Sequence, residues 1–143
     1  LFDRFGADVQ FYVVYIQEAH AIDSPSPMRN GPLVQEPVTL EERLALAQQC
    51  TTALSLARIP TLVDLLDDRV GAAYQAWPDR LYLVGADGRI VYAGAPGPAG
   101  FRPEELGAAI ERILPGRRDE PAPSRAGTPQ EGARGSSDSP SKL

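Results

Sequence analysis

Val9 to Ile16, VQFYVVYI, is the stretch that decides the fold. Its alternating positions are apolar on both faces, with Phe11, Val13 and Tyr15 on one side and Tyr12, Val14 and Ile16 on the other. A strand that is apolar on both faces is typical of the middle of a sheet with helices on each side. The stretch therefore predicts a central strand, and residues 1–5 before it predict the last turns of a helix.

A helix and a second buried strand are predicted downstream. Thr39 and Glu42 form a capping box, which predicts a helix over residues 39–57 with Leu40, Leu44, Ala47, Thr51 and Leu54 on its apolar face. Residues 61–66 (TLVDLL) predict the second strand. Asp67 or Asp68 is then expected to cap a short helix whose buried face carries Val70, Ala73, Tyr74 and Trp77.

The chain is predicted to close with a hairpin and a helix. Residues 81–84 and 89–92 flank an Asp87-Gly88 turn. Pro103 opens a helix that directs Leu106, Ile110 and Ile113 inward. The order predicts the α/β class, with one mixed central sheet in a three-layer sandwich. A thioredoxin-like domain has this order, but it opens with one more strand and a turn, which we expect before Leu1.

Composition narrows the function. The chain has 143 residues with 14 basic and 19 acidic side chains, a net charge of −5 that disfavours nucleic acid as a partner. Its single Cys cannot form an internal disulfide or a Cys-rich zinc site, so no metal is expected. No apolar run is long enough for a membrane span and no signal peptide is visible, which favours a cytoplasmic location. Because the first residue is not Met, we expect a fragment.

Two segments are predicted from the change in composition near Leu114. Residues 1–114 are expected to form the domain. Residues 115–143 lack aromatic side chains and have few apolar ones beyond Ala, so they cannot bury enough surface to offset the entropy of ordering. We expect this tail to be disordered.

Glu18 and His20 follow the central strand and are the first candidates for catalysis. Ligands gather at the carboxyl ends of strands in open α/β sheets. Alternation places both side chains on one side, where a carboxylate can orient an imidazole for proton transfer. The alternative is a surface histidine on a polar loop.

Arg80 is a second candidate because it immediately precedes a buried strand. An arginine there can hold an anion or stabilise a thiolate or selenolate. The alternative, which the pattern alone favours, is a charge at a strand end that extends into water. The glycine-rich loop of residues 94–100, GAPGPAG, is interpreted as a wall beside the site.

Two other features are interpreted as structural. Cys50 lies in mid-helix among apolar residues, which favours a core position over a nucleophile. Asp64, Asp67 and Asp68 resemble a cation site, but no further oxygen ligands converge on them. We expect these three carboxylates to cap a helix and face solvent.

Four segments together resemble the iodothyronine deiodinases and their bacterial deiodinase-like relatives. They are YIQEAHAID (residues 15–23), TLEERLALA (39–47), IPTLVDLLDDRVGAAYQAWPDRLYLV (59–84) and GRIVYAGAPGPAGF (88–101). The first is similar to the family's YIEEAHPSD. The GAPGP form and the DGRI turn resemble the bacterial branch.

The resemblance implies a thioredoxin-like fold with a peroxiredoxin-like site. A cysteine or selenocysteine at the first strand-to-helix turn would remove iodine from an aromatic ring, and an external thiol would regenerate it without another cofactor. Glu18 and His20 would handle protons, and Arg80 would lie near the nucleophile. Gly97, Pro98 and Phe101 would bind substrate. A homodimer is compatible with this assignment.

The chain departs from the family pattern at four places. The nucleophile motif would lie before Leu1, the first Glu of EEAH is Gln17, and Pro37 and Pro96 replace a histidine and a basic residue of vertebrate members. The last two changes argue against thyroid hormone as substrate. Two alternatives stay open: a peroxiredoxin-type thiol peroxidase that acts on a peroxide, and a non-catalytic thioredoxin-like binding module.

The last three residues, Ser141-Lys142-Leu143, match a peroxisomal address. Lys142 is the only lysine in a chain with 13 arginines, a bias that suggests a GC-rich bacterial genome. We interpret the match as chance and expect a peroxisomal location only for a eukaryotic source.

Overall fold

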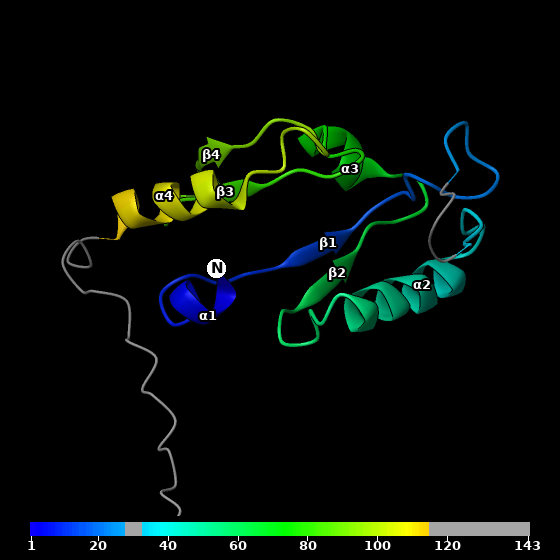
Figure 1. Cartoon of the computed structure of the whole chain (residues 1–143), viewed down its shortest axis with the longest axis horizontal. Coiled ribbons are helices and arrows are strands. Elements are labelled where there is room, and N and C mark those ends of the chain that lie inside the picture. Colours follow the sequence, from blue (N-terminus) through cyan, green and yellow to red (C-terminus); the bar gives the residue numbers. More distant parts are fainter. Residues whose placement is uncertain (28–32, 115–143) are drawn as a thin grey trace, which may run out of the picture.

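The structure is a computed structural model that describes residues 1–27 and 33–114. The tail of residues 115–143, for which disorder is predicted, lies outside the described residues. The order of elements is the predicted one (Figure 1). The elements are α1 (Phe2–Phe5), β1 (Val13–Tyr15), α2 (Leu40–Ala53), β2 (Thr61–Val63), α3 (Arg69–Tyr74), β3 (Tyr82–Val84), β4 (Ile90–Ala93) and α4 (Pro103–Ile113).

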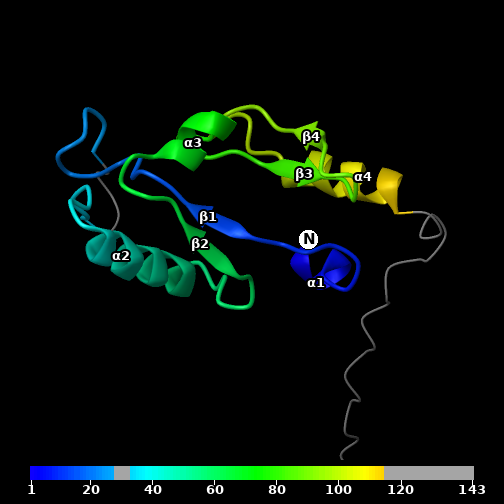
Figure 2. The ribbon, with the colours of Figure 1, turned by 180° about the vertical axis from the view of Figure 1, so that it is seen from behind.

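The strands form two small sheets in the described part of the chain. β1 and β2 are parallel, with Val14 opposite Leu62, and β3 and β4 are antiparallel. Figures 1 and 2 show β1 between β2 and the β3–β4 hairpin. This is a mixed α/β arrangement compatible with a thioredoxin-like fold. The single mixed sheet predicted from the sequence is not formed by hydrogen bonds among these strands.

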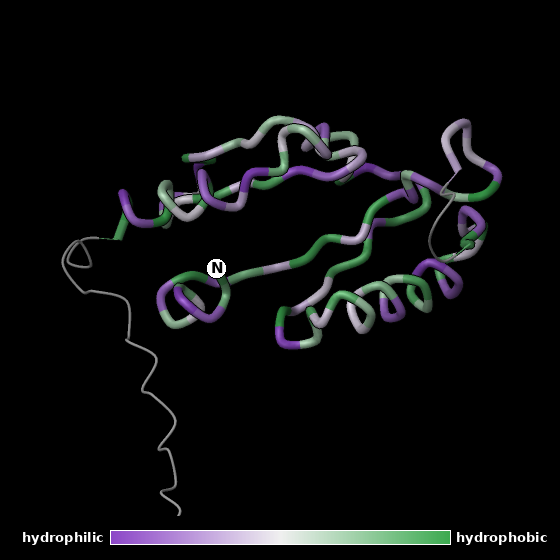
Figure 3. Tube along the Cα trace, in the orientation of Figure 1, coloured by the Kyte–Doolittle hydropathy of each residue, from purple (hydrophilic) through white to green (hydrophobic). Residues whose placement is uncertain are grey.

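The face of β1 and β2 that carries Val14 and Leu62 is open. Figure 3 shows the hydrophobic character of both strands. Val14 is nevertheless 40% exposed and its partner Leu62 is 52% exposed. α2 packs against β2, and the alternation of burial along both strands places the covered side chains on the other face. The prediction that β1 is buried on both faces is therefore wrong for the described residues, because a helix covers one face only.

α2 begins where the capping box predicts. Thr39 Oγ1 accepts the Glu42 N–H, and the Glu42 carboxylate accepts the Thr39 N–H. The helix ends at Ala53, four residues before the predicted end at residue 57, and Ser55 follows with a positive φ of 56°.

The predicted apolar face of α2 is only partly buried. The buried residues are Arg43, Ala47 and Thr51, while Leu40, Leu44 and Leu54 are exposed. The three buried residues are spaced four residues apart along almost the whole helix, so they form one stripe, and the exposed leucines lie off it.

The predicted apolar face of α3 is mostly uncovered, although Val70 is half-buried. Ala73, Tyr74 and Trp77 are exposed, and Gly71 is the buried residue of the helix. A Cβ atom at Gly71 would lie 3.5 Å from both Asp64 and Ile16. The helix therefore approaches the end of β1 at Gly71, at a distance that would leave a Cβ atom in ordinary van der Waals contact.

The hydrophobic core lies in the other half of the molecule. Leu83 of β3 packs with Leu106, Ala109 and Ile110 of α4, and Phe5 of α1 completes this cluster. Leu106 and Ile110 are buried as predicted, but Ile113 is exposed at the last residue of the helix. The Asp87-Gly88 hairpin is confirmed, with Gly88 at φ 79°. Phe5 thus packs the N-terminal segment against the core formed by β3 and α4.

Candidate functional site

Glu18 lies just beyond β1, where the strand ends in a polar loop. Its backbone N–H donates to Oε2 of Glu36 over 3.0 Å. The Glu18 side chain is half-buried, and this burial raises the pKa of its carboxyl. Glu36 raises the pKa further by repulsion, while Arg43 and His20 act in the opposite direction. Glu18 is thus a carboxyl group that holds its proton more tightly than an exposed glutamate.

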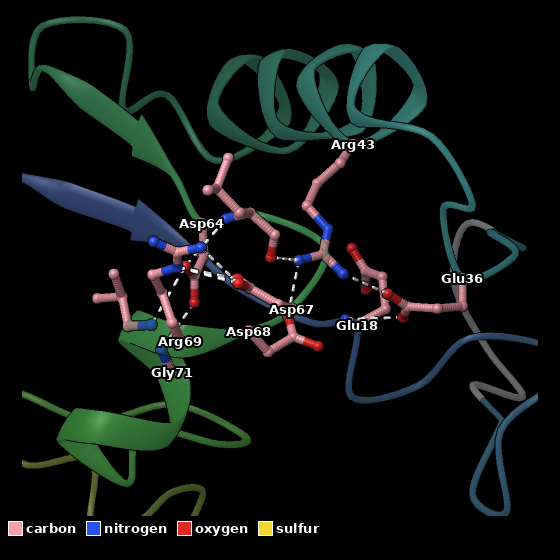
Figure 4. A network of polar contacts seen from close by, with 10 residues as sticks. Glu18, Glu36, Arg43, Asp64, Asp67, Asp68, Arg69 and Gly71 are labelled. Carbon is pink, nitrogen blue, oxygen red and sulfur yellow. Dashed lines mark hydrogen bonds and ion pairs between the residues drawn. The ribbon is translucent and has the colours of Figure 1, made fainter.

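Arg43 is the buried centre of this region (Figure 4). The residue is 2% exposed, on the face of α2 that packs against the strands. Its Nη2 donates to Oε1 of Glu36 over 2.9 Å, and its Nη1 donates to Asp68 Oδ1 over 2.6 Å and to the Leu65 carbonyl over 2.7 Å. One guanidinium therefore joins α2 to the loop before it and to the segment between β2 and α3.

Asp64 caps α3 from the end of β2. Its Oδ1 accepts the N–H of Leu65 over 2.9 Å and of Val70 over 3.2 Å, and its Oδ2 accepts the N–H of Gly71 over 2.7 Å. The residue is 2% exposed, so the prediction that it faces solvent is wrong. A carboxylate that accepts several N–H groups at a helix N-terminus can be buried because its charge is fully solvated by those donors.

The other two aspartates, unlike Asp64, make ion pairs with arginines. Asp67 pairs with Arg69 at the surface, and Asp68 pairs with Arg43. Asp68 is the N-cap residue of α3 by position, but its side chain makes no capping hydrogen bond. Within residues 1–27 and 33–114, no group of three or more potential ligands is arranged to hold a metal ion.

His20 is exposed two residues after Glu18. Its Nδ1 lies 2.9 Å from the carbonyl oxygen of Ser26. A carbonyl can only accept, so Nδ1 carries the proton in this contact and Nε2 of the neutral ring is left as the acceptor. The sequence predicts that Glu18 orients the imidazole. In the structure the Ser26 carbonyl orients it instead, because the loop of residues 21–26 folds back on the ring. Glu18 and His20 still interact electrostatically.

Arg80 is fixed by backbone atoms of two segments. Its Nε donates to the Gly94 carbonyl over 2.6 Å, and its Nη1 donates to the Gln75 carbonyl over 3.3 Å. The guanidinium lies 5.4 Å from the centre of the Tyr82 ring. Figure 1 shows that the chain enters β3 at the end of the molecule where β1 finishes, and Arg80 lies two residues before β3 begins.

The glycine-rich loop closes against Asp79. The Gly97 N–H donates to the Asp79 carbonyl over 2.9 Å, and a Cβ atom at Gly97 would collide with the Asp79 carboxyl group. Pro98 and Phe101 are exposed, as surface residues of a wall would be. The loop of residues 94–100 is therefore held at the backbone of Asp79, whose carboxyl group has a buried oxygen without a hydrogen-bond partner among the described residues.

Cys50 is unsuited to act as a nucleophile. Burial raises the pKa of its thiol, and the charge of Glu18 raises it further. Both effects disfavour the thiolate, which is the reactive form. The sequence-based interpretation of Cys50 as structural is consistent with this environment, although its side chain is only half-buried.

Sequence reasoning did not identify Arg43 or Glu36, and it placed the capping residue Asp64 at the surface, whereas Asp64 is buried. For Arg43 a signal was present: it lies on the same helix stripe as Ala47 and Thr51, at spacings of four and eight residues. A charged residue on the buried stripe requires carboxylate partners. Glu36 carries no such signal, since it lies in a loop without periodicity.

These features define a class of protein. The chain is a mixed α/β domain whose polar residues gather at the carboxyl ends of two parallel strands, which is where such sheets bind ligands. The sequence profile described as iodothyronine deiodinase matches residues 1–114. The chain therefore belongs to the iodothyronine deiodinase family.

Individual relatives agree with this assignment. The chain is 40% identical over 118 residues to the thyroxine 5-deiodinase of Sparus aurata, covering 77% of this chain and 40% of the relative. It is 32% identical over 112 residues to the type I iodothyronine deiodinase of Xenopus laevis, covering 78% and 43%. The human thyroxine 5-deiodinase is 30% identical over 115 residues, covering 78% and 36%. The chain thus spans about two fifths of the length of these relatives.

In the parts of the chain that the structure describes, none of the helices combines the length and the apolar character needed to cross a bilayer.

Proposed function

We propose that this chain is the proton-handling part of a deiodinase-like oxidoreductase of the bacterial branch that removes iodine from an iodinated aromatic substrate. The observation that carries the proposal is the half-buried Glu18 beside His20 in a member of this family. The nucleophile would be a cysteine or selenocysteine from outside the described residues, since burial and the charge of Glu18 raise the pKa of the Cys50 thiol.

The reaction is a two-electron reduction of the carbon–iodine bond. The thiolate or selenolate attacks iodine and forms a sulfur–iodine or selenium–iodine bond while the carbon–iodine bond breaks. The ring carbon takes a proton from the carboxyl group of Glu18 or from the protonated ring of His20, the two proposed donors. One thiol then displaces iodide and forms a mixed disulfide or selenenyl sulfide, and a second thiol releases the free nucleophile and becomes part of an external disulfide.

We further propose that the complete fold is the three-layer thioredoxin-like sandwich. β1 pairs with β2 along one edge, and β3 pairs with β4 along one edge. The other edge of β1 and the other edge of β3 are unpaired within the described residues. Because β1 lies between β2 and the hairpin, the unpaired edge of β1 is on the side of the hairpin (Figures 1 and 2). An additional strand there would join both pairs into one mixed sheet and place the turn after it near Glu18.

Arg80 is proposed as the residue that favours the anionic chalcogen. Its two hydrogen bonds go to uncharged carbonyl groups, so its positive charge is not neutralised by those contacts. A cation held in this way lowers the pKa of a nearby thiol or selenol. Gly97, Pro98 and Phe101 are proposed to form the adjacent wall against which an aromatic ring lies.

The test uses a protein that carries this domain together with its cysteine or selenocysteine. Iodinated phenols and hydrogen peroxide are offered separately with a dithiol, and iodide release and peroxide loss are measured. We expect iodide release, reduced at least tenfold in His20→Ala and Glu18→Gln, with Glu41→Gln on the exposed start of α2 as the matched control. Peroxide loss without iodide release would replace the proposal by a thiol peroxidase, and neither activity would favour a binding module.

A further inference from the structure

One donor of the buried Arg43 has no partner among the residues that the structure describes. Nη1 and Nη2 together make three hydrogen bonds, but Nε is buried without a hydrogen-bond acceptor among the described residues. A buried N–H group that is left unpaired costs free energy, and such groups in proteins usually have an acceptor in some state of the molecule. The unpaired Nε–H is therefore a site at which a nearby acceptor can form a hydrogen bond.

Glu18 is the acceptor that the surroundings offer. Figure 4 shows its side chain directed toward the guanidinium of Arg43, next to the side chain of Glu36. The charges of Glu36, Arg43 and His20 all act on the Glu18 carboxyl, and Glu18 in turn acts on the thiol of Cys50. Among the described residues whose charges act on the Glu18 carboxyl, only Arg43 combines a permanent positive charge with a donor that has no acceptor.

We propose that Arg43 is the positioning residue that receives the carboxylate of Glu18 on its Nε–H once Glu18 has given up its proton. This inference deepens and rests on the proposed role of Glu18 as a proton donor. The proton leaves the Glu18 carboxyl for the ring carbon, and no electrons are transferred in this step. The carboxylate that remains then gains a charge-assisted hydrogen bond, which is stronger than a neutral one.

Glu36 makes this transfer possible with little movement. One of its oxygens holds Nη2 of Arg43, and the other holds the backbone N–H of Glu18. The guanidinium and the Glu18 backbone are thereby fixed relative to each other through a single carboxylate. In this proposal, a rotation of the Glu18 side chain brings its carboxylate onto the Nε–H of Arg43.

The inference can be tested on the chain itself, without substrate. The Nε–H group of an arginine gives its own NMR signal, so the Arg43 signal is followed as the pH is raised through the titration of Glu18. We expect it to move with the same midpoint as the Glu18 carboxyl, because the hydrogen bond forms only with the ionised group. The movement is expected to disappear in Glu18→Gln and to persist in the control Glu41→Gln.

Two further variants distinguish the inference from a general disturbance of structure. In Glu36→Gln the repulsion of Glu18 is removed, so the midpoints of the Glu18 carboxyl and of the Arg43 signal are expected to fall together. Arg43→Lys has no Nε–H and is expected to raise the midpoint of Glu18. An Arg43 signal that is indifferent to Glu18, or that keeps its movement in Glu18→Gln, would overturn the inference. Because this readout needs no turnover, its failure is distinguishable from an absence of iodide release.

Discussion

Arg43 and Glu36 form an ion pair of 2.9 Å in which the guanidinium is buried and the carboxylate continues to the N–H of Glu18. The pair connects α2 to the end of β1 through a loop that has no regular structure of its own. The position of the candidate proton donor therefore depends on a residue 25 positions downstream of it.

The first prediction concerns the stability that Arg43 provides. Arg43→Met leaves Glu36 and Asp68 without their cation, and we expect the free energy of unfolding to fall by about 3 kcal/mol in urea titrations. Arg58→Met is the control, since its ion pair with Asp3 is exposed on both sides and is expected to contribute less than about 1 kcal/mol. Equal effects of the two substitutions would contradict the central position of Arg43.

The second prediction concerns Asp64 as the cap of α3. Asp64→Ala removes the acceptor of three N–H groups, so we expect a loss of about 2 kcal/mol and faster hydrogen exchange at Val70 and Gly71. Asp67→Ala changes an exposed carboxylate of the same segment and is expected to leave those amides protected. Unchanged exchange at Gly71 in Asp64→Ala would show that the helix is capped in another way.

The third prediction concerns the contact between Gly97 and Asp79. A methyl group at residue 97 would collide with the Asp79 carboxyl group, so Gly97→Ala is expected to cost about 1–3 kcal/mol. The double variant Asp79→Ala with Gly97→Ala should recover most of this loss, because the colliding group is gone. Additive effects of the two substitutions in a double-mutant cycle would argue against the contact.

The fourth prediction concerns the dependence of stability on pH. The pKa of Glu18 is raised in the folded state, first by burial and then by Glu36. The folded state therefore binds the Glu18 proton more tightly than the unfolded chain. Its stabilising effect is present below the unfolded pKa and is lost as the pH rises through the folded one. Wild type should lose stability relative to Glu18→Gln over this window in urea titrations, and a constant difference would be the contrary result.

The order of elements can be predicted from local sequence, whereas the contacts that build the candidate site cannot. The capping box of Thr39 and Glu42 and the Asp87-Gly88 turn each require only residues close in the chain, and both are confirmed. The carboxylate partners of Arg43 lie 7 and 25 residues away, so its burial depends on contacts that no local period encodes. The same limit explains why Val14 was expected to be buried: periodicity shows that a face is apolar, not what covers it.

The role of Glu18 as proton donor is the central claim, and the pH profile of a single turnover tests it most directly. With an iodinated phenol and a protein that carries its nucleophile, we expect the rate of iodide release to fall as the pH rises through the raised pKa of Glu18, since the ionised carboxyl has no proton to give. In Glu18→Gln this descending limb should be absent and the rate uniformly low. A descending limb that is identical in Glu18→Gln would contradict the account.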